Sequence, residues 1–296
     1  MGFELVHILI QTLQQGLIYS LAVLGFAFSL RMLAYADLTL EGSFVLGGVM
    51  TAIVLSHGLP VLWAFPLALV AGILAGLFTA FQHCFLRINK LLSGIITLAI
   101  LYSLNLRFQG RPNESFYGFS TVYDLLPQGA DFLLLIIPTV LVLFLVCWWL
   151  LNTEWGLFLR ACGENEKVVT KAGYSRLPFL LIGLSLGNGL IALSGCLFSQ
   201  YMGFSDVNIS GGLIVVALTS LILGEILFRP TSVTGFLLAI VVGSILCQLI
   251  NTICLYLNLH PSDHKGIVGV LLIGLVYCRR YIAQKQTKKP IGAEVF

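Results

Sequence analysis

Charged residues that could support recognition gather in one internal polar segment, residues 153–176 (TEWGLFLRACGENEKVVTKAGYSR), with hydrophobic runs on both sides. Elsewhere the residue types that chemistry needs are scattered. The chain has no HExxH pattern and no carboxylate–histidine cluster at helical spacing, so we expect neither a metal site nor catalytic residues. Charge gathered in one loop of a hydrophobic chain indicates a contact surface for a soluble partner.

The nucleotide-binding pattern GxxxxGKS/T is also absent. If the protein works with ATP and Mg, we expect another chain to bind them and no cofactor on this one. The cysteines form no CxxC pair and lie mostly inside apolar runs, which is typical of small packing residues. They are Cys84, Cys147, Cys162, Cys196, Cys247, Cys254 and Cys278.

The composition places the chain in a membrane. Hydrophobic residues make up 58% of its 296 residues and charged residues 10%, against roughly 25% charged residues in a soluble domain; mean hydropathy is +0.98. Apolar runs of about 17 to 25 residues, long enough to cross about 30 Å of hydrocarbon, recur along the chain. We predict one all-α polytopic membrane domain, residues 1–296, with about 8 to 10 transmembrane helices and a broken helix after the first span. The expected spans are residues 6–30, 43–57, 60–86, 91–106, 131–151, 177–201, 211–228, 232–257 and 266–282.

Lysine and arginine placement predicts the orientation, because short cytoplasmic loops retain these residues and exported loops have few of them. One orientation puts the segment 153–176 and a basic tail, residues 279–296, in the cytoplasm, and leaves outside only Arg107, Arg111 and Lys265. We expect the tail to contact anionic lipid headgroups, and the net charge of +3 does not indicate nucleic acid as a partner. This span count would place the N-terminus outside, whereas a broken segment near residues 31–46 could add a crossing and place it inside.

Within the polar segment, capping residues predict two short helices. Thr153 is placed to cap a first helix, which Gly163 would end. A second helix would run from Glu164 to Ala172, with Gly173 as its C-terminal cap. The expected product is a compact helix-turn-helix element.

The same segment carries the pattern GxxxRAxGxN, followed by one further glycine. The residues of this pattern are Gly156, Arg160, Ala161, Gly163, Asn165 and Gly173. Here the chain resembles the cytoplasmic coupling loop of ABC importer permeases of the branched-chain amino acid and ribose type. The resemblance implies that the loop docks in a groove of an ATP-binding subunit; the alternative is an ordinary amphipathic connector.

A second stretch, residues 35–48, resembles the part of this family in which the chain re-enters the membrane as a broken helix. Asp37 is placed to accept hydrogen bonds from backbone N–H groups at the start of that helix. A carboxylate within the membrane costs about 2.5 to 3.5 kcal/mol, so a buried Asp37 or Glu41 requires a function, whereas a pair at the cytoplasmic surface does not. We group both with Asn105 and Asn188 as candidates for the translocation path or gate. Capping and gate architecture is the favoured role, and direct substrate contact is the alternative.

A third stretch, residues 102–113, resembles the subgroup of these permeases associated with amino acid uptake, including systems assigned to tryptophan and tyrosine. Arg107 and Arg111 lie one helical turn apart near the expected outer surface. They are candidates to contact acidic residues of an extracytoplasmic substrate-binding protein, or a carboxylate in transit. Pro112 is expected to end this helix, so the alternative for Arg111 is a solvated end residue.

Other residues within the spans predict packing. Two glycine pairs suit close helix contact, either within one chain or between two: Gly72 with Gly76, and Gly183 with Gly187. Glu225 and Arg229 are expected to form a surface ion pair at a helix end.

The resemblance implies a permease subunit of an ABC importer in a bacterial inner membrane, with a cytoplasmic C-terminus. Expected partners are an ABC ATP-binding subunit, an extracytoplasmic substrate-binding protein and a second permease chain in a homodimer. Such a chain forms the path for a small solute, here expected to be an amino acid, and is not itself an enzyme. The alternative is a stand-alone secondary transporter driven by Na+ or H+, which favours paired acidic residues deep in the spans and an inverted repeat; the sequence shows neither clearly. A membrane-embedded enzyme is a weaker hypothesis, because a catalytic constellation is lacking.

Overall fold

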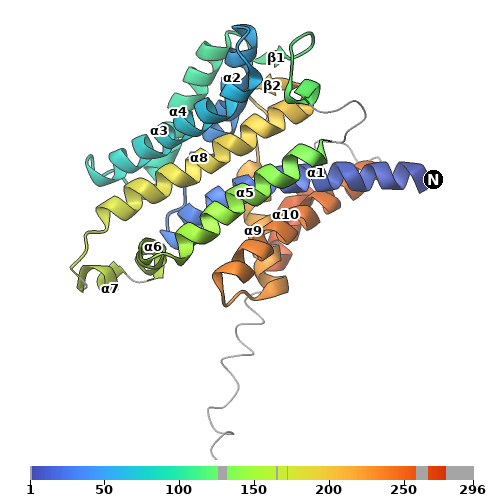
Figure 1. Cartoon of the computed structure of the whole chain (residues 1–296). Helices are drawn as coiled ribbons and strands as arrows, with labels where there is room; N and C mark the ends of the chain where they lie inside the picture. The colour runs from blue at the N-terminus through green and yellow to red at the C-terminus, as the bar shows by residue number, and fades with distance from the viewer. Residues whose placement is uncertain (1, 126–131, 165, 172, 258–265, 278–296) are drawn as a thin grey trace, which may run out of the picture.

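The computed structural model describes residues 2–125, 132–164, 166–171, 173–257 and 266–277 (Figure 1). The chain forms a bundle of helices, with short elements and one two-stranded sheet at its ends. The long helices are α1 (Gly2–Ala27), α2 (Leu40–Ser56), α3 (Ala64–Cys84), α4 (Lys90–Gln109), α5 (Leu133–Asn152), α8 (Leu177–Met202), α9 (Leu213–Phe228) and α10 (Val233–Tyr256). The short elements are η1 (Phe28–Met32), η2 (Val61–Trp63), β1 (Asn113–Ser115), η3 (Val122–Leu125), α6 (Glu154–Glu164), α7 (Glu166–Lys171) and β2 (Phe204–Asp206). A further apolar helix, Gly266–Tyr277, follows α10.

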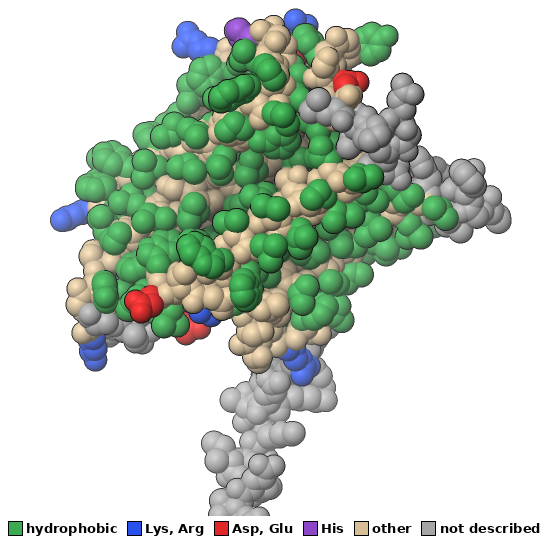
Figure 2. Space-filling model, in the orientation of Figure 1, with side chains coloured by type: hydrophobic (Ala, Val, Ile, Leu, Met, Phe, Trp, Pro, Cys, Tyr) green, Lys and Arg blue, Asp and Glu red, His purple; other side chains and the backbone are tan. Residues whose placement is uncertain are grey.

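The helices match the expected membrane spans. In the part of the chain that the structure describes, 6 helical segments are long and apolar enough to cross a membrane. Three shorter apolar helices, Leu40–Ser56, Leu213–Phe228 and Gly266–Tyr277, account for the remaining expected spans. In Figure 2, hydrophobic side chains cover most of the visible face and the few charged ones lie toward its edges, as contact with hydrocarbon requires. The prediction of an all-α membrane bundle is confirmed.

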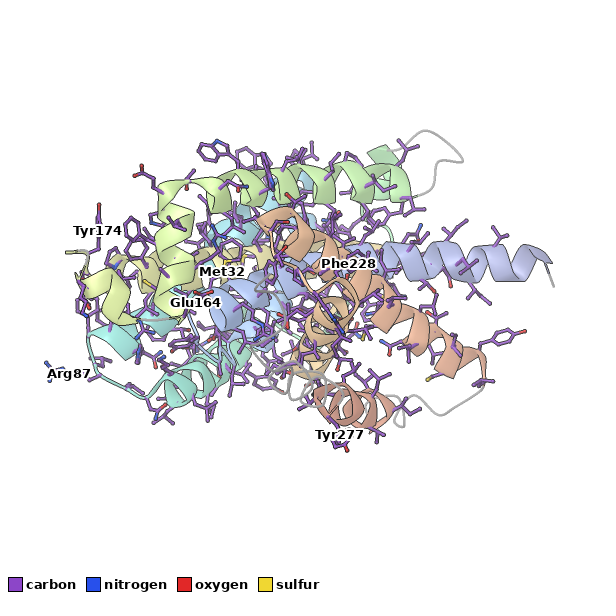
Figure 3. The ribbon with its side chains drawn as sticks, turned by 90° about the horizontal axis from the view of Figure 1, so that it is seen from below. Met32, Arg87, Glu164, Tyr174, Phe228 and Tyr277 are labelled. Carbon is purple, nitrogen blue, oxygen red and sulfur yellow. The ribbon has the colours of Figure 1, made fainter. Side chains whose placement is uncertain are left out.

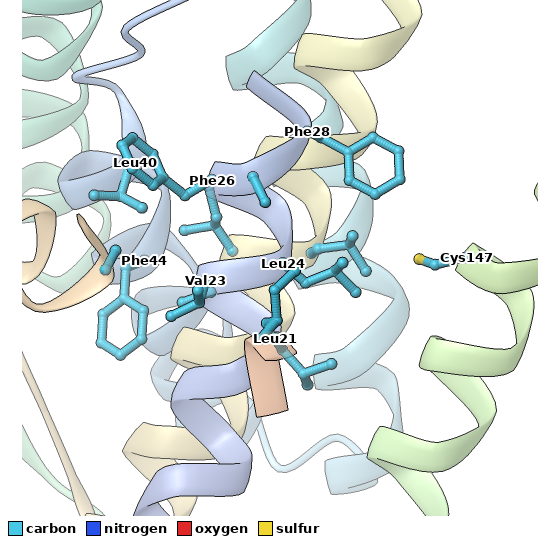
Figure 4. Close-up of a cluster of buried hydrophobic side chains, with 14 of the residues drawn as sticks. Leu21, Val23, Leu24, Phe26, Phe28, Leu40, Phe44 and Cys147 are labelled. Atoms are coloured by element: carbon cyan, nitrogen blue, oxygen red, sulfur yellow. The ribbon is translucent and has the colours of Figure 1, made fainter. Parts of the chain in front are cut away.

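Helix α1 lies at the centre of the bundle. Nearly every residue from Ile18 to Ser29 is buried. In Figure 4, side chains of α1 project to several sides of the helix, with Phe44 of α2 on one side and Cys147 of α5 on the other. A helix that is hydrophobic all round must be covered all round, and α8, α10, α5 and α9 pack around this one.

Glycines allow α2 to approach α8 closely. A Cβ atom on Gly195 would lie 1.8 Å from the carbonyl oxygen of Phe44, and one on Gly47 would lie 1.8 Å from that of Ala192. Both distances are far shorter than a non-bonded contact allows. The crossing of these two helices therefore depends on the absence of side chains at both positions.

The two glycine pairs noted in the sequence also pack within one chain. Gly72 and Gly76 lie against α8, Gly187 lies against Gly25 of α1, and Gly183 lies against Leu33 and Leu159. Of the two alternatives for these faces, contact between helices of the same chain is the one observed.

The ends of the bundle differ. At one end β1 pairs antiparallel with β2, with Asn113 opposite Asp206; we call this the sheet end. At the other lie α6 and α7, and we call it the α6 end (Figure 1). Helix α1 begins on the side away from α6, and α2 runs back toward the sheet end, where it contacts β2. The break between α1 and α2 is therefore a turn within the bundle and adds no further crossing.

Helix α4 extends past the expected span, residues 91–106, but ends before Pro112. Its C-terminal cap is Gly110, which has a φ of 78° in the left-handed region that glycine adopts without strain. The prediction that Pro112 ends this helix is wrong, because Pro112 lies beyond the end. Arg111 also lies outside the helix, so it does not share a helical face with Arg107.

Replacing Gly195 with alanine should destabilise the bundle, because the new Cβ would overlap the Phe44 carbonyl group and push α2 away from α8. Overpacking of this kind typically costs about 1–3 kcal/mol. We expect a lower unfolding temperature for the detergent-purified protein. Gly269→Ala is the control, since a Cβ there has no described atom within 4 Å. An equal loss of stability in both variants would contradict the packing argument.

Candidate functional site

The polar segment 153–176 forms two short helices between α5 and α8, as predicted. Thr153 caps α6, because its Oγ1 accepts a hydrogen bond from the backbone N–H of Gly156 at 3.3 Å. After α7, Gly173 has a φ of 83° and its N–H donates to the carbonyl of Thr170 at 3.1 Å. These two contacts confirm the predicted caps of the helix-turn-helix element.

The predicted helix end at Gly163 is wrong, since α6 continues to Glu164. A Cβ atom on Gly163 would lie 2.6 Å from the carbonyl oxygen of Met32 in η1, and Figure 3 shows Glu164 beside Met32. Glycine is therefore required here for close approach to η1 and not for ending the helix. Asn165, another residue of the pattern, lies outside the described residues.

The other residues of the GxxxRAxGxN pattern also contact the rest of the chain. A Cβ on Gly156 would lie 2.5 Å from the carbonyl oxygen of Leu150. The Arg160 guanidinium donates to the carbonyl of Leu151 at 3.3 Å, one of the carbonyls at a helix end that lack an intrahelical partner. Ala161 packs against the core. The pattern thus determines how the segment folds back on α5 and η1.

The opposite side of the segment is exposed and partly apolar. Leu157 and Tyr174 are 59% and 51% exposed, and the ring of Tyr174 lies 4.5 Å from that of Phe158, which itself packs on the core. The exposed charged residues Glu164 and Lys171 lie on the same segment. We call these four exposed residues the outer face. Figure 3 shows Tyr174 at the margin of this end of the molecule.

The segment holds the connection between α1 and α2, residues 28–39, which we call the junction. It begins with one π-helical turn, η1, a geometry that is often found at functional sites. Gly163 of α6 contacts this turn, and Arg176, at the other end of the segment, donates a hydrogen bond to the carbonyl of Leu33 at 3.3 Å. Because both parts of the segment contact the junction, a displacement of the segment acts on it directly.

Asp37 lies within the junction and is only 1% exposed. Its Oδ1 accepts a hydrogen bond from the backbone N–H of Thr39 at 2.9 Å, and its Oδ2 accepts one from Nδ2 of Asn188 at 2.7 Å. Ser43 donates to Oδ1 of Asn188 at 2.6 Å. Asp37 therefore lies inside the bundle, level with the middle of α8, and not at its surface.

Glu41 and Asn105 bind at the same place, the first turn of α2. Oε1 of Glu41 accepts a hydrogen bond at 2.9 Å from the backbone N–H of Gly212, the N-cap of α9. Nδ2 of Asn105 donates to the carbonyl of Gly42 at 3.2 Å. The four predicted path or gate residues thus surround the start of α2, and each makes a hydrogen bond to a protein group. This geometry shows capping and packing contacts, and the role of these residues in a path or gate stays a prediction.

One ion pair at the junction was not predicted. Arg31 of η1 pairs with Glu225 of α9. The expected pairing of Glu225 with Arg229 is wrong, because the helix has already ended at Arg229, whose φ is 44°. Arg31 and Glu225 are 194 positions apart in the chain, so spacing along the sequence does not indicate this contact.

A chain of hydroxyl groups was also missed. The Oγ1 atoms of Thr39 and Thr79 lie 2.9 Å apart, and Thr79 donates to Thr97 at 3.0 Å. Gln82 donates to Thr97 at 2.9 Å. These contacts link the junction to α3 and α4. The signal in the sequence is polar residues inside apolar runs, which does not identify their partners.

Arg107 and Arg111 lie at the sheet end. Both are exposed, and Nε of Arg111 lies 2.7 Å from Oε2 of Glu114 in β1. Gln109 connects the end of α4 to β2, since its Nε2 donates to the carbonyl of Ser205 at 2.9 Å. The two arginines are therefore on the surface opposite the segment 153–176.

Within the described ranges, no group of three or more His, Cys, Asp or Glu side chains is placed to hold a metal ion.

These features define a class of protein, a multi-pass helical membrane protein whose helix-turn-helix segment packs on the junction of its first two helices. Residues 8–276 match the family described as the permease component of branched-chain amino acid transport systems, and the chain belongs to that family. It is 31% identical, over 90% of its length and 90% of the relative, to the tyrosine transport system permease protein of Clostridioides difficile. It is 34% identical, over 90% of its length and 95% of the relative, to an uncharacterized protein of Rickettsia prowazekii.

One solved structure, PsaBC from Streptococcus pneumoniae in complex with Fab, has a similar fold. The TM-score is 0.56 and the identity 14%, over 94% of each chain. At this identity the likeness concerns the fold alone. The family match confirms the resemblance to ABC importer permeases on which the sequence analysis relied, and it makes the chain an ABC transporter permease.

Asn188→Leu should destabilise the protein, because the buried Asp37 carboxylate loses its side-chain donor. A hydrogen bond to a charged group contributes about 1.5–3 kcal/mol, so we expect a lower unfolding temperature. Adding Asp37→Asn should recover part of the loss, since a neutral amide costs less to bury than a carboxylate. Asn208→Leu, at an exposed position, is the control. Wild-type stability of Asn188→Leu would show that the pair does not hold the junction.

Charge reversal tests the contact between Arg31 and Glu225. Arg31→Glu brings two carboxylates together and should lower the free energy of unfolding by about 1 kcal/mol or more. Combining it with Glu225→Arg restores opposite charges and should recover most of that loss, measured by thermal unfolding in detergent. A combined variant that is less stable than both single variants would exclude a direct pair.

Proposed function

We propose that this chain is the permease subunit of an ATP-driven importer, and that the segment 153–176 is the surface on which a separate ATP-binding subunit docks. The observation that carries the proposal is the two-sided character of this segment. Its inner side is fixed to α5 and to the junction, whereas Leu157 and Tyr174 on its outer face are exposed. Exposed apolar and aromatic side chains on a well-packed support are typical of protein contact surfaces.

The contacts of the segment support a route for coupling. A docked subunit that moves the segment acts first on the junction, through Gly163 and Arg176. The ion pair between Arg31 and Glu225 connects the junction to α9. The hydrogen bond between Asp37 and Asn188 connects the junction to α8. In this proposal ATP-driven closure of two ATP-binding subunits switches the path between outward and inward access. Asp37, Glu41, Asn105 and Asn188 hold the gate together as it moves.

The location and partners follow from this role. The α6 end faces the cytoplasm of a bacterial inner membrane, and the sheet end faces an extracytoplasmic substrate-binding protein, with Arg107 and Arg111 as candidate contacts. A second copy of the permease completes the path as a homodimer. The basic tail, residues 279–296, lies outside the described residues; we propose that it is cytoplasmic and contacts anionic lipid. ATP and Mg bind to the ATP-binding subunit, and this chain carries neither a cofactor nor an enzymatic activity.

The proposed cargo is an amino acid. Two observations support this choice: the family is described by branched-chain amino acid transport, and one relative at 31% identity is a tyrosine transport system permease protein. The extracytoplasmic binding protein would deliver the amino acid to the sheet end.

Leu157→Asp combined with Tyr174→Asp tests the docking surface. Both side chains are more than half exposed, so these changes should leave the fold intact and remove apolar contacts. Loss of central contacts of this kind costs about 2 kcal/mol or more. We therefore expect the variant to retain less than a tenth of the wild-type amount of the ATP-binding protein encoded beside it when the two are purified together.

Tyr117→Asp is the matched control, because Tyr117 is 95% exposed at the sheet end. It should retain the ATP-binding protein as wild type does. Full retention by the Leu157 and Tyr174 variant would refute the docking surface, whereas equal losses in variant and control would point to a general effect of added acidic residues.

A further inference from the structure

A cavity of about 340 Å³ lies between α1, α8, α10, the start of α9 and the helix Gly266–Tyr277. Its volume is within the range of about 300–1,000 Å³ that is usual for small-molecule sites. Phe198 and Asn251 on its wall belong to the last turns of α8 and α10. The cavity is therefore nearer the sheet end than the α6 end, and it is separate from the junction.

Three amide side chains line this cavity, Gln15, Gln248 and Asn251. Gln248 and Asn251 are 4% and 6% exposed. Nδ2 of Asn251 donates to Oε1 of Gln248 at 3.0 Å, but Oδ1 of Asn251 has no hydrogen-bond partner within the described part of the chain. An unsatisfied buried acceptor costs about 1–3 kcal/mol, and buried polar groups inside a membrane bundle are functional candidates for that reason. A solute that donates to this amide would remove the cost.

The rest of the wall is aromatic and aliphatic. Tyr19 and Phe198 both line the cavity, and their ring centroids are 5.2 Å apart. Among the described lining residues there is no Asp, Glu, Lys, Arg or His. Against these described residues, a solute with a net charge would lose its hydration without meeting an opposite charge.

A zwitterion without net charge suits this wall better. Amides both donate and accept hydrogen bonds, so Gln248 and Asn251 together can serve a carboxylate and an ammonium group. Aromatic rings offer a large apolar contact area for the remainder of the solute. The carboxylate of Glu41 accepts a hydrogen bond from the backbone N–H of Gly212, one of the lining residues.

We propose that this cavity is a solute site within a single permease chain, and that it takes an amino acid of no net charge with an apolar or aromatic side chain. Gln248 and Asn251 hold its charged groups, and Tyr19 and Phe198 contact its side chain. This inference rests on the proposed function, because it requires that the chain passes a solute. It adds selectivity in the permease to the selectivity of the binding protein.

Proteoliposomes that contain the permease, its ATP-binding subunit and its binding protein test the site with radiolabelled L-tyrosine, L-leucine and L-arginine. Wild type should import tyrosine or leucine and exclude arginine. Asn251→Leu combined with Gln248→Leu should lower this uptake at least tenfold at equal amounts of assembled complex. Met202→Trp fills the cavity without removing an amide, and it should have the same effect; it decides the matter if the amide variant does not assemble.

Leu238→Ala is the control on the same helix, at a position that is 53% exposed, and it should import at the wild-type rate. If Met202→Trp and the assembled amide variant both import at the wild-type rate, the site is overturned and the proposed function stays intact. The same holds if the wild-type complex prefers arginine to tyrosine and leucine. A wild-type complex that hydrolyses ATP but imports none of the three amino acids would instead contradict the proposed cargo, and the inference with it.

Discussion

The junction between α1 and α2 carries non-helical backbone through the interior of a membrane bundle, where each unsatisfied polar group costs several kcal/mol. Asp37 accepts a hydrogen bond from the N–H of Thr39, the N–H of Tyr35 donates to the carbonyl of Ser29 at 2.9 Å, and Arg176 donates to the carbonyl of Leu33. The partners of these backbone groups come from the junction itself and from the segment 153–176. The position of α2, and with it the packing of α2 on α8, depends on these pairs.

The same contacts that stabilise the junction connect it to the segment 153–176. A side chain at position 163 would not fit, because α6 packs on the carbonyl of Met32. Arg176 donates to the carbonyl of Leu33, the next residue of the junction. The segment therefore cannot shift far without moving the end of α1 and the start of α2. A partner on its outer face would act on helices deep in the membrane through packing that the fold already requires.

Composition and run length were sufficient to predict the helical membrane bundle, because a helix satisfies its own backbone and must be apolar where it meets lipid. Caps such as Thr153 and Gly173 were also predictable, since they depend on residues within a few positions. The role of Gly163 was not, because its reason is a carbonyl group on η1, more than a hundred residues earlier in the chain. The backbone contact of Asp37 with the N–H of Thr39 agrees with the prediction. Its contact with Asn188 and that of Glu225 with Arg31 were missed, because pairs far apart in the chain have no characteristic spacing in the sequence.

The described residues of the GxxxRAxGxN pattern lie on the inner side of the segment 153–176. Gly156, Arg160 and Gly163 are recognisable because the fold constrains them, while the exposed Leu157 and Tyr174 carry no signal of their own. A single sequence therefore located the docking element more readily than the side chains that face a partner.

In the proposed function, a separate ATP-binding subunit opens this path through the segment 153–176. Uptake of radiolabelled amino acid into proteoliposomes, measured with the permease alone and with its ATP-binding subunit and binding protein, tests it most directly. We expect uptake only in the complete system with ATP, and none by the permease alone under a Na+ or H+ gradient. Gradient-driven uptake by the permease alone at the rate of the complete system would contradict it.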